Sequence, residues 1–476
     1  MFTYMLYGNR GPPPSVAVFI FLNIYIEREE EEMRLHGTQV VNEQGHLEIG
    51  GCDTVELANQ YGTPLYIMDE AHIRDICRQY HHSFVEGMGN AEVIYASKAF
   101  STLAMCRIID EEGLGLDVVS GGELYTALQA NFSAARIYFH GNNKSREELE
   151  MAINAGVGRI VVDNFYEMSI LNELAKDLNQ HVDILLRVTP GIEAHTHEYI
   201  QTGQIDSKFG FTLPDGTADR ALDLALSYPN LKVKGIHAHI GSQIFELDSF
   251  RHEVQIMINY MATILSRTGC LLKELNLGGG FGIYYASGDD PAQVADYAKT
   301  VEAALKDACE DRNFPRPKII VEPGRSIVGT AGTTLYTVGS IKEIPEIRKY
   351  VAVDGGMADN PRPALYQARY EAILANRAKE EAVESVSVTG KCCESGDMLI
   401  WDIDLPKAVA GDLLAVSCTG AYNYSMSSNY NRLTRPGVVL VEGGHADVIV
   451  RRETHSDLLR NDVLPARLKY LQIASR

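Results

Sequence analysis

Between Glu92 and Arg325 the sequence alternates eight times between a short apolar run and an amphipathic stretch. The eight runs are VIYASK (93–98), LDVVS (116–120), RIYFHG (136–141), RIVVDN (159–164), DILLRVTP (183–190), VKGIHAHIGS (233–242), LNLGGG (275–280) and KIIVEPGR (318–325). Near-continuous apolar runs are typical of parallel strands that are buried on both faces. The pattern therefore predicts an α/β fold built on a parallel sheet.

The amphipathic stretches between these runs predict helices. In SREELEMAINAG (145–156), Ser145 is the expected N-cap, acidic residues fill the first turn and Gly156 is the expected C-cap. Similar helices are expected at 121–131 and 164–178, and a further one at 70–86 before the first strand. Eight strand–helix cycles predict a (β/α)₈ TIM-like barrel. A doubly wound open sheet, which would have fewer strands, is the alternative.

The helix alternation stops after Arg325, and the rest of the chain predicts a β-rich domain of sandwich-like or barrel-like form. Strands are expected at TTLYTVGSI (333–341), KYVAVDGG (349–356), ESVSVTG (384–390), DLLAVS (412–417), GVVLVEGG (437–444) and ADVIVRRET (446–454). Turn residues separate these segments, as in antiparallel sheets. The chain is thus expected to hold a barrel followed by a C-terminal β-rich domain.

The first 32 residues differ from the rest of the chain. Val16 to Ile26 is an apolar run of only 11 residues, whereas a membrane span needs about 20. The acidic run EREEEE (27–32) follows it, without the cleavage site of a signal peptide. We therefore expect residues 1–32 to be an extension that is disordered or absent from the native product, and we expect no membrane segment.

Cysteine content and charge restrict the partners and the compartment. The chain has eight cysteines and no CxxC spacing, which argues against a disulfide scaffold or a zinc ribbon and favours the reducing cytoplasm. Its formal net charge of −20 argues against nonspecific binding to nucleic acid or acidic membranes.

Reactive side chains gather at the ends of the predicted strands, where barrel enzymes carry their chemistry. Lys98 ends the first strand, His239 the sixth, Gly278 to Gly280 the seventh, and Glu322 with Arg325 the eighth. A lysine in a barrel mouth can form a Schiff base with a carbonyl group, although a lone lysine at a strand end is more often a solvent-facing side chain.

The other groups also have more than one interpretation. His237 and His239 lie two apart on a strand and so face the same side. They could form a hydrogen-bonded pair, a metal site completed by Glu322 and His140, or an imidazole stacked on a cofactor ring. The glycines could bind a phosphate or simply form a tight turn. Glu322 and Arg325 could form a surface ion pair, or serve a pyridine nitrogen and an anion.

Taken together, a Schiff-base lysine, a stacking histidine, phosphate glycines and a nitrogen-facing carboxylate make a site for pyridoxal 5′-phosphate (PLP). The sequence resembles the fold type III PLP-dependent decarboxylases, and among them most closely the diaminopimelate decarboxylase family. The resemblance covers roughly 37–463. Its motifs are YASKAF (95–100), HAHIGSQ (237–243), LNLGGGFGI (275–283), VEPGRS (321–326), NPRPALY (360–366), CESGD (393–397) and GAY (420–422).

The resemblance implies a role for each matching residue. Lys98 carries the PLP, His239 lies against its ring, and Glu322 faces the ring nitrogen. The cofactor phosphate is surrounded by Ser242, Gly278, Gly279, Gly280, Gly324, Arg325 and Tyr422. The substrate is held by Arg325, Arg362, Tyr366, Glu394 and Tyr422, with the arginines on its distal carboxylate and Glu394 on its distal ammonium. Cys393 is the expected proton donor, which makes Lys98, His239 and Cys393 the catalytic set. No metal site is predicted.

The family likeness also implies an activity and an assembly. The expected reaction is the PLP-dependent decarboxylation of meso-2,6-diaminopimelate to L-lysine and CO₂, the last step of lysine biosynthesis, in a homodimer whose active sites are shared between chains. Another basic amino-acid decarboxylase, a noncatalytic PLP-binding protein and, more distantly, a metal hydrolase are the alternatives. The segments 195–203 and 207–211 are further features of this family, whereas Lys391 stands where the family has proline.

The likeness also implies the order of the domains. The segment from Gly37 to Leu65 is expected to contribute strands to the β-rich domain, so that the barrel is inserted into it. The predicted boundaries are therefore 1–32 for the extension, 66–326 for the barrel, and 33–65 plus 327–476 for the β-rich domain.

Overall fold

The computed structural model describes residues 34–191 and 207–468, and within them eight parallel strands close a barrel. The strands are β5 (Ala91–Ala96), β6 (Gly115–Val118), β7 (Ile137–Phe139), β8 (Arg159–Val162), β9 (Val182–Thr189), β11 (Leu231–His237), β12 (Glu274–Asn276) and β13 (Lys318–Val321). The barrel closes because β13 pairs with β5 and β8 pairs with β9. A short strand, β10 (Phe211–Thr212), adds to the end of β9. The barrel prediction is confirmed, and the open sheet is excluded.

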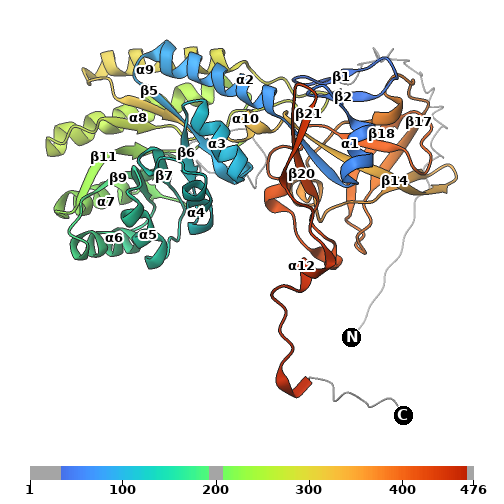
Figure 1. Ribbon diagram of the computed structural model, residues 1–476. Coiled ribbons are helices and arrows are strands. Elements are labelled where there is room, and N and C mark those ends of the chain that lie inside the picture. Colours follow the sequence, from blue (N-terminus) through green and yellow to red (C-terminus); the bar gives the residue numbers. More distant parts are fainter. Residues whose placement is uncertain (1–33, 192–206, 469–476) are drawn as a thin grey trace, which may run out of the picture. The chain divides into compact units, whose positions relative to one another are not determined.

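Helices follow the strands and surround them, as Figure 1 shows for α3 to α9. They are α3 (Leu103–Glu111), α4 (Gly121–Gln129), α5 (Arg146–Ala155), α6 (Phe165–Asp177), α7 (Thr217–Ser227), α8 (Leu247–Thr268), α9 (Val294–Arg312) and the short α10 (Arg325–Val328), with α2 (Glu70–Tyr80) before β5. None of the described helices has the length and apolar content needed to cross a membrane.

Helix α5 shows how local sequence sets these boundaries. The Ser145 hydroxyl accepts the backbone N–H of Glu148, and the Glu148 carboxylate accepts the backbone N–H of Ser145. Gly156 ends the helix with φ of 73°, in the left-handed region. Both predicted caps are confirmed, and each satisfies backbone groups that a helix end would otherwise leave unpaired.

Side chains inside the barrel form three layers, because alternate residues of a strand face the same side. At the amino-terminal end, charged groups pair across strands, with Arg159 contacting Glu274 and Lys318 contacting Glu92. The middle layer is apolar and almost fully buried; its members are Ile94, Tyr138, Val161, Leu185 and Ile320. The third layer, at the carboxyl ends, is again polar. It includes Glu322, two residues beyond Ile320, and it faces the site.

The β-rich part contains a mixed sheet in the order β18-β17-β15-β14-β4-β20-β21, with β19 joining β14 and β16 joining β19. Its strands are β4 (Leu65–Asp69), β14 (Gly332–Ile344), β15 (Arg348–Val353), β16 (Ala372–Leu374), β17 (Glu384–Thr389), β18 (Met398–Leu405), β19 (Leu413–Val416), β20 (Gly437–Glu442) and β21 (His445–Val450). All six strands expected from the sequence are present, whereas β16 and β18 were not expected.

The segment before the barrel divides between two sheets. Strands β1 (Val40–Val41), β2 (Leu47–Ile49) and β3 (Cys52–Asp53) form a small antiparallel sheet of their own, followed by α1 (Thr54–Tyr61). Strand β4 instead pairs with β14 and β20 of the mixed sheet. We propose the domain division given above, 66–326 against 33–65 plus 327–476, with β4 lying across its first boundary. The expected extension, 1–32, lies outside the described residues.

Candidate active site

The carboxyl ends of the barrel strands open into a cavity of about 710 Å³. Residues of the β-rich part, among them Arg362 and Tyr422, line it together with residues of the barrel. Of the site residues predicted from the sequence, those that line the cavity are Lys98, His239, Ser242, Gly279, Gly280, Glu322, Gly324, Arg325, Arg362, Tyr366 and Tyr422. The fold thus brings together groups that are far apart in the sequence.

The turn after β12 requires glycine at successive positions. Gly278 and Gly280 have φ values of +64° and +105°, which L side chains rarely adopt. A Cβ on Gly279 would lie 2.3 Å from the backbone carbonyl oxygen of Glu322. The Gly279 amide donates to Nδ1 of His239 at 3.3 Å. The glycines therefore let the ends of β11, β12 and β13 pack against one another at the cavity.

Arg325 connects several groups on one side of the cavity. Its Nη2 donates to the Ser242 hydroxyl at 2.9 Å, and its Nη1 donates to Tyr285 Oη at 2.6 Å. Its guanidinium carbon lies 4.9 Å from the centre of the Tyr422 ring. Tyr422 has φ of +66°, uncommon for a tyrosine, and its amide donates to the Ala99 carbonyl. This hydrogen bond joins the β-rich part to the turn that carries Lys98.

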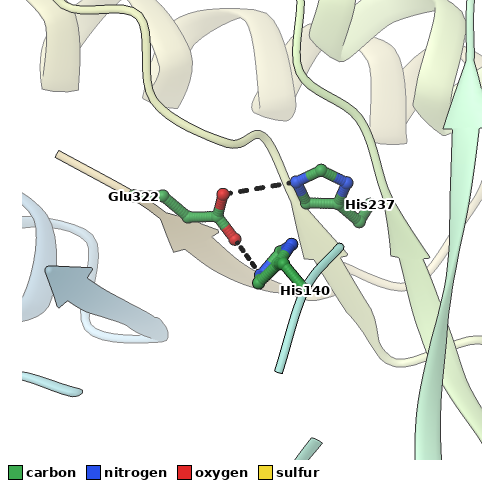
Figure 2. A group of neighbouring side chains, drawn as sticks. All are labelled: His140, His237 and Glu322. Atoms are coloured by element: carbon green, nitrogen blue, oxygen red, sulfur yellow. Dashed lines mark hydrogen bonds and ion pairs between the residues drawn. The ribbon is translucent and has the colours of Figure 1, made fainter. Parts of the chain in front are cut away.

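Glu322 lies at the centre of a buried cluster (Figure 2). Its Oε1 lies 2.9 Å from Nε2 of His140 and accepts a 2.7 Å hydrogen bond from the Asn276 amide. Its Oε2 lies 3.3 Å from Nε2 of His237. Burial alone would raise the pKa of Glu322, but His140 and His237 outweigh that effect and hold it well below its usual range. Glu322 is therefore a carboxylate at neutral pH.

The neighbouring ionisable groups are shifted mainly by burial. Burial lowers the pKa of His237 to about 4 although Glu322 is adjacent. Burial, together with nearby Lys98, holds the pKa of His239 well below its usual range. Burial raises the pKa of Asp117 to about 6, with His140 acting in the opposite direction. The two histidines of the His-x-His motif are thus neutral imidazoles at neutral pH.

The structure meets only part of the requirement for a metal site at the His-x-His motif. Among the described residues, the ligand atoms of His140, His237 and Glu322 lie within 4.8 Å of one another, as a metal site would need. His239 does not belong to this group, and its Nδ1 accepts a hydrogen bond from the Gly279 amide. The two histidines of the motif therefore contact different groups.

Lys98 and Arg362 approach the cavity from the two parts of the fold. Lys98 lies in the 3₁₀ turn Ser97–Ala99 directly after β5. Arg362 begins the short helix α11 (Arg362–Tyr366) and is only 7% exposed. Its Nη1 donates to Tyr370 Oη at 2.6 Å, and its guanidinium carbon lies 4.8 Å from the centre of the Tyr285 ring. Tyr285 therefore lies between Arg362 and Arg325.

Three predicted site residues do not line the cavity of the single chain. Gly278 lies just behind its wall, against His239. Cys393 is exposed, and its amide donates to Asn431 Oδ1 at 2.7 Å. Glu394 follows it in the same loop. The family feature at 195–203 lies outside the described residues.

Sequence reasoning missed several groups that line or support the cavity: Asp117, Arg187, Asn276 and Tyr285. Asp117 and Arg187 are single charged positions within apolar strands, which was a usable signal, because a charge in a buried strand needs a partner. No comparable signal marked Asn276 or Tyr285.

Comparison with known proteins identifies the family. The profile described as "Pyridoxal-dependent decarboxylase, pyridoxal binding domain" matches residues 70–329. The diaminopimelate decarboxylase of Bacillus subtilis is 55% identical over 431 residues, covering 90% of this chain and 98% of that protein. The chain belongs to the diaminopimelate decarboxylase family. The Halalkalibacterium halodurans member of this family is 56% identical over 431 residues, again 90% of this chain and 98% of that protein.

A solved member of the diaminopimelate decarboxylase family shares the fold. The crystal structure of the diaminopimelate decarboxylase of M. jannaschii in complex with L-lysine is 37% identical, with a TM-score of 0.86, and the match covers 92% of this chain and all of that one. The chain is accordingly a PLP-dependent decarboxylase, a carbon–carbon lyase that acts on a small molecule.

The cavity suits the cofactor of a diaminopimelate decarboxylase. Its volume lies within the range of about 300–1,000 Å³ that small-molecule sites occupy. Nε of Arg325 is buried without a hydrogen-bond partner among the described residues, so a donor remains for an anion beside Ser242 and the glycine turn. Glu322 offers a carboxylate for a protonated ring nitrogen, and Lys98 offers an amine for the aldehyde. The residues present therefore fit PLP.

Proposed function

We propose that the chain catalyses the PLP-dependent decarboxylation of meso-2,6-diaminopimelate to L-lysine and CO₂, the last step of lysine biosynthesis. One observation carries the proposal. Arg362 lines the same cavity as Lys98 and Glu322, so a cation for a distal carboxylate lies in one space with the groups that suit the cofactor. The names of the similar proteins support the same substrate.

The cofactor is held by groups from several strand ends. Lys98 would hold it covalently through its side-chain amine. His239, which lines the cavity, would lie against the ring. The phosphate is bound by Arg325 and Ser242, the backbone of Gly278 to Gly280 and of Gly324, and Tyr422. Support for the phosphate position comes from the Arg325–Ser242 hydrogen bond and from the crowding that excludes any side chain at Gly279.

The chemistry depends on the charge of Glu322. When bound, PLP supplies an electron sink for the negative charge that loss of CO₂ leaves on the substrate's α-carbon. Glu322 stays ionised because neighbouring donors outweigh its burial, and an ionised carboxylate keeps a facing ring nitrogen protonated. His239 is a neutral imidazole that accepts from Gly279, so it adds no positive charge beside the ring.

The distal end of the substrate carries both a carboxylate and an ammonium. Arg325, Arg362 and Tyr366 bind the carboxylate, Glu394 binds the ammonium, and Tyr422 closes over both ligands. Cys393 gives its thiol proton to the α-carbon after CO₂ has left and recovers a proton from water. An acidic residue in place of Arg362 would instead suit a diamine-forming decarboxylase.

Cys393 and Glu394 act in the partner's site of a homodimer. Their exposure in the single chain, outside the cavity of their own barrel, supports this arrangement. Mixing a Lys98→Ala chain with a Cys393→Ala chain tests it, because one of the two sites in a mixed dimer would then carry both intact residues. We expect up to about half of the wild-type activity per mixed dimer. Mixed dimers without activity would contradict shared sites.

We also propose a cytoplasmic location. All eight cysteines lie within the described residues, and all are free thiols, as is usual in a reducing compartment.

The substrate assignment is tested by turnover of a panel of amino acids with the purified, PLP-loaded chain. We expect CO₂ release from meso-diaminopimelate with kcat/KM at least about 100-fold above that for L-lysine, L-ornithine and L-arginine, because only diaminopimelate offers both distal charges. Faster turnover of ornithine, arginine or lysine would assign a different basic amino-acid decarboxylase. CO₂ release from none of them would leave a noncatalytic PLP-binding protein.

A further inference from the structure

Side chains from three different strand ends contact the carboxylate of Glu322, and Figure 2 shows two of them, His140 and His237. Asn276 ends β12, His237 ends β11, and His140 follows β7 directly. A carboxylate has about four lone-pair sites; Asn276 and His237 hydrogen-bond to two of them, and Nε2 of His140 lies 2.9 Å from a third position on Oε1. One acceptor site therefore remains for a ligand in the cavity.

The donor atom of His237 follows from its surroundings. Nδ1 of His237 is buried without a hydrogen-bond partner among the described residues. A hydrogen on Nδ1 would be an unsatisfied buried donor, which is costly, so the hydrogen sits on Nε2 and points to Glu322. The His140 and His237 rings pack edge to face with centres 4.9 Å apart. Each ring therefore fixes the other.

The position of His140 is set by a buried anchor behind it. Its backbone N–H donates to the Val118 carbonyl at 2.8 Å. In the loop that follows, Lys144 donates to the carbonyls of Gly141 and Val161 and to the Glu167 carboxylate, at 2.7–2.9 Å. A lysine with three partners and almost no exposure holds this loop in one geometry.

We infer that His140 and His237 are positioning residues that set the ionisation and orientation of Glu322 and, through Glu322, the protonation of the cofactor ring. The inference rests on the proposed function, since it requires PLP in this cavity. Neither histidine needs to touch the cofactor. Their effect is carried by the carboxylate, which would otherwise be a buried group that gains by taking up a proton.

Other charged groups also act on Glu322. The Asp117 carboxylate lies 3.8 Å from Nε2 of His140 and opposes a second negative charge. Among the described residues, the other titratable groups that face this cluster are Arg187, His239, Glu253, Lys98 and Asp163. With two carboxyl groups in one buried layer, the contacts on Glu322 decide which of the two loses its proton at the lower pH.

The test replaces each histidine with phenylalanine, which keeps the ring packing and removes the donor, and with glutamine, which keeps a donor. The matched control is His82→Phe, since the His82 side chain is 82% exposed. Two properties of the holoenzyme are measured besides activity: the dissociation constant of PLP, and the absorbance of bound PLP between pH 6 and 9. Thermal unfolding checks that each variant is folded.

We expect His140→Phe and His237→Phe to raise the PLP dissociation constant about tenfold or more, as for a lost hydrogen bond to a charged group. Their bound-PLP spectra should titrate in this pH range, where the wild-type spectrum stays constant. The glutamine variants should restore both properties, and His82→Phe should match the wild type. In a Glu322→Gln background, the phenylalanine substitutions should add less than about twofold, because they act through Glu322.

Unchanged affinity and spectra in both phenylalanine variants would overturn the inference. So would a full tenfold effect that persists in the Glu322→Gln background, because the histidines would then act independently of Glu322. These results are distinct from failure of the proposed function. If the wild-type chain bound no PLP, the proposed function and the inference about the histidines would both fail. If the wild type binds PLP and decarboxylates diaminopimelate, the proposed function stands, and the histidine variants alone decide the inference.

Discussion

Arg362 is the residue on which the substrate assignment depends, and Arg362→Leu tests it. The guanidinium has five N–H donors, of which the described structure uses one, on Tyr370. Its position over the Tyr285 ring fixes its plane at the cavity wall. The remaining donors are therefore oriented before the substrate arrives, which limits the entropy lost on binding.

The magnitude follows from this geometry. Removing one partner of a buried, hydrogen-bonded charge pair costs about 2–5 kcal/mol. Arg325 lines the same cavity and retains part of the attraction, so we take the lower half of that range, about 2–3 kcal/mol. This corresponds to a fall in kcat/KM of about 30- to 150-fold. KM should carry most of it, because the distal carboxylate does not change during the reaction.

The assay compares two inhibitors as well as the substrate. L-Lysine retains one carboxylate, whereas 1,5-diaminopentane has none. Arg362→Leu should raise the inhibition constant of lysine by about the same factor as the KM of diaminopimelate and leave that of diaminopentane within about twofold. The matched control is Arg348→Leu, because Arg348 also stacks on an aromatic ring, that of Trp401, but does not line the cavity. An unchanged KM, or equal losses for both inhibitors, would refute the assignment.

Three further changes have defined outcomes. Gly279→Ala places a Cβ 2.3 Å from a backbone oxygen and should weaken PLP binding at least about tenfold in a PLP titration. The control Gly122→Ala, whose Cβ meets nothing nearer than 3.7 Å, should leave the PLP affinity unchanged, and equal affinities of the two variants would contradict the packing argument. Burial raises the pKa of Asp359 to about 7, so its contribution to stability is fully present below the unfolded-state pKa of about 4 and is lost as the pH rises through 7. In urea unfolding, Asp359→Asn should therefore gain stability relative to the wild type between pH 4 and 8, and a difference that does not change with pH would contradict this. Ile320→Ala, in the apolar middle layer and fully buried, should lower the free energy of unfolding by about 2–5 kcal/mol; denaturation that shows under 1 kcal/mol would mean the layer is not close-packed.

The barrel could be predicted because each of its strands carries its own signal. A parallel strand buried on both faces is a continuous apolar run, and the helix caps Ser145 and Gly156 act on their nearest neighbours. Strand β18 lacks such a signal. Asp402 has φ of +51°, the pairing with β17 shifts register, and Trp401 is 58% exposed. A bulge of this kind breaks the alternation from which a strand is recognised.

The site could be predicted only as separate groups. Lys98, His239 and Glu322 were found because strand ends in a barrel meet at one face. The donors on Glu322 and the placement of Tyr285 between two arginines depend on barrel closure and on contact with the β-rich part. Neither the donors on Glu322 nor the placement of Tyr285 is marked by a pattern of neighbouring residues in the sequence. Cys393 and Glu394 rested on the family likeness alone, and their roles remain proposals.

We propose that PLP on Lys98 performs the decarboxylation, and one titration tests this claim. The PLP-loaded chain is reduced with increasing amounts of borohydride, and each sample is divided. Peptide mass spectrometry gives the fraction of Lys98 that carries reduced PLP, and CO₂ release from meso-diaminopimelate gives the residual activity. We predict that activity falls in direct proportion to modified Lys98. Full activity with Lys98 modified, or cofactor fixed on another lysine while activity is lost, would contradict the claim.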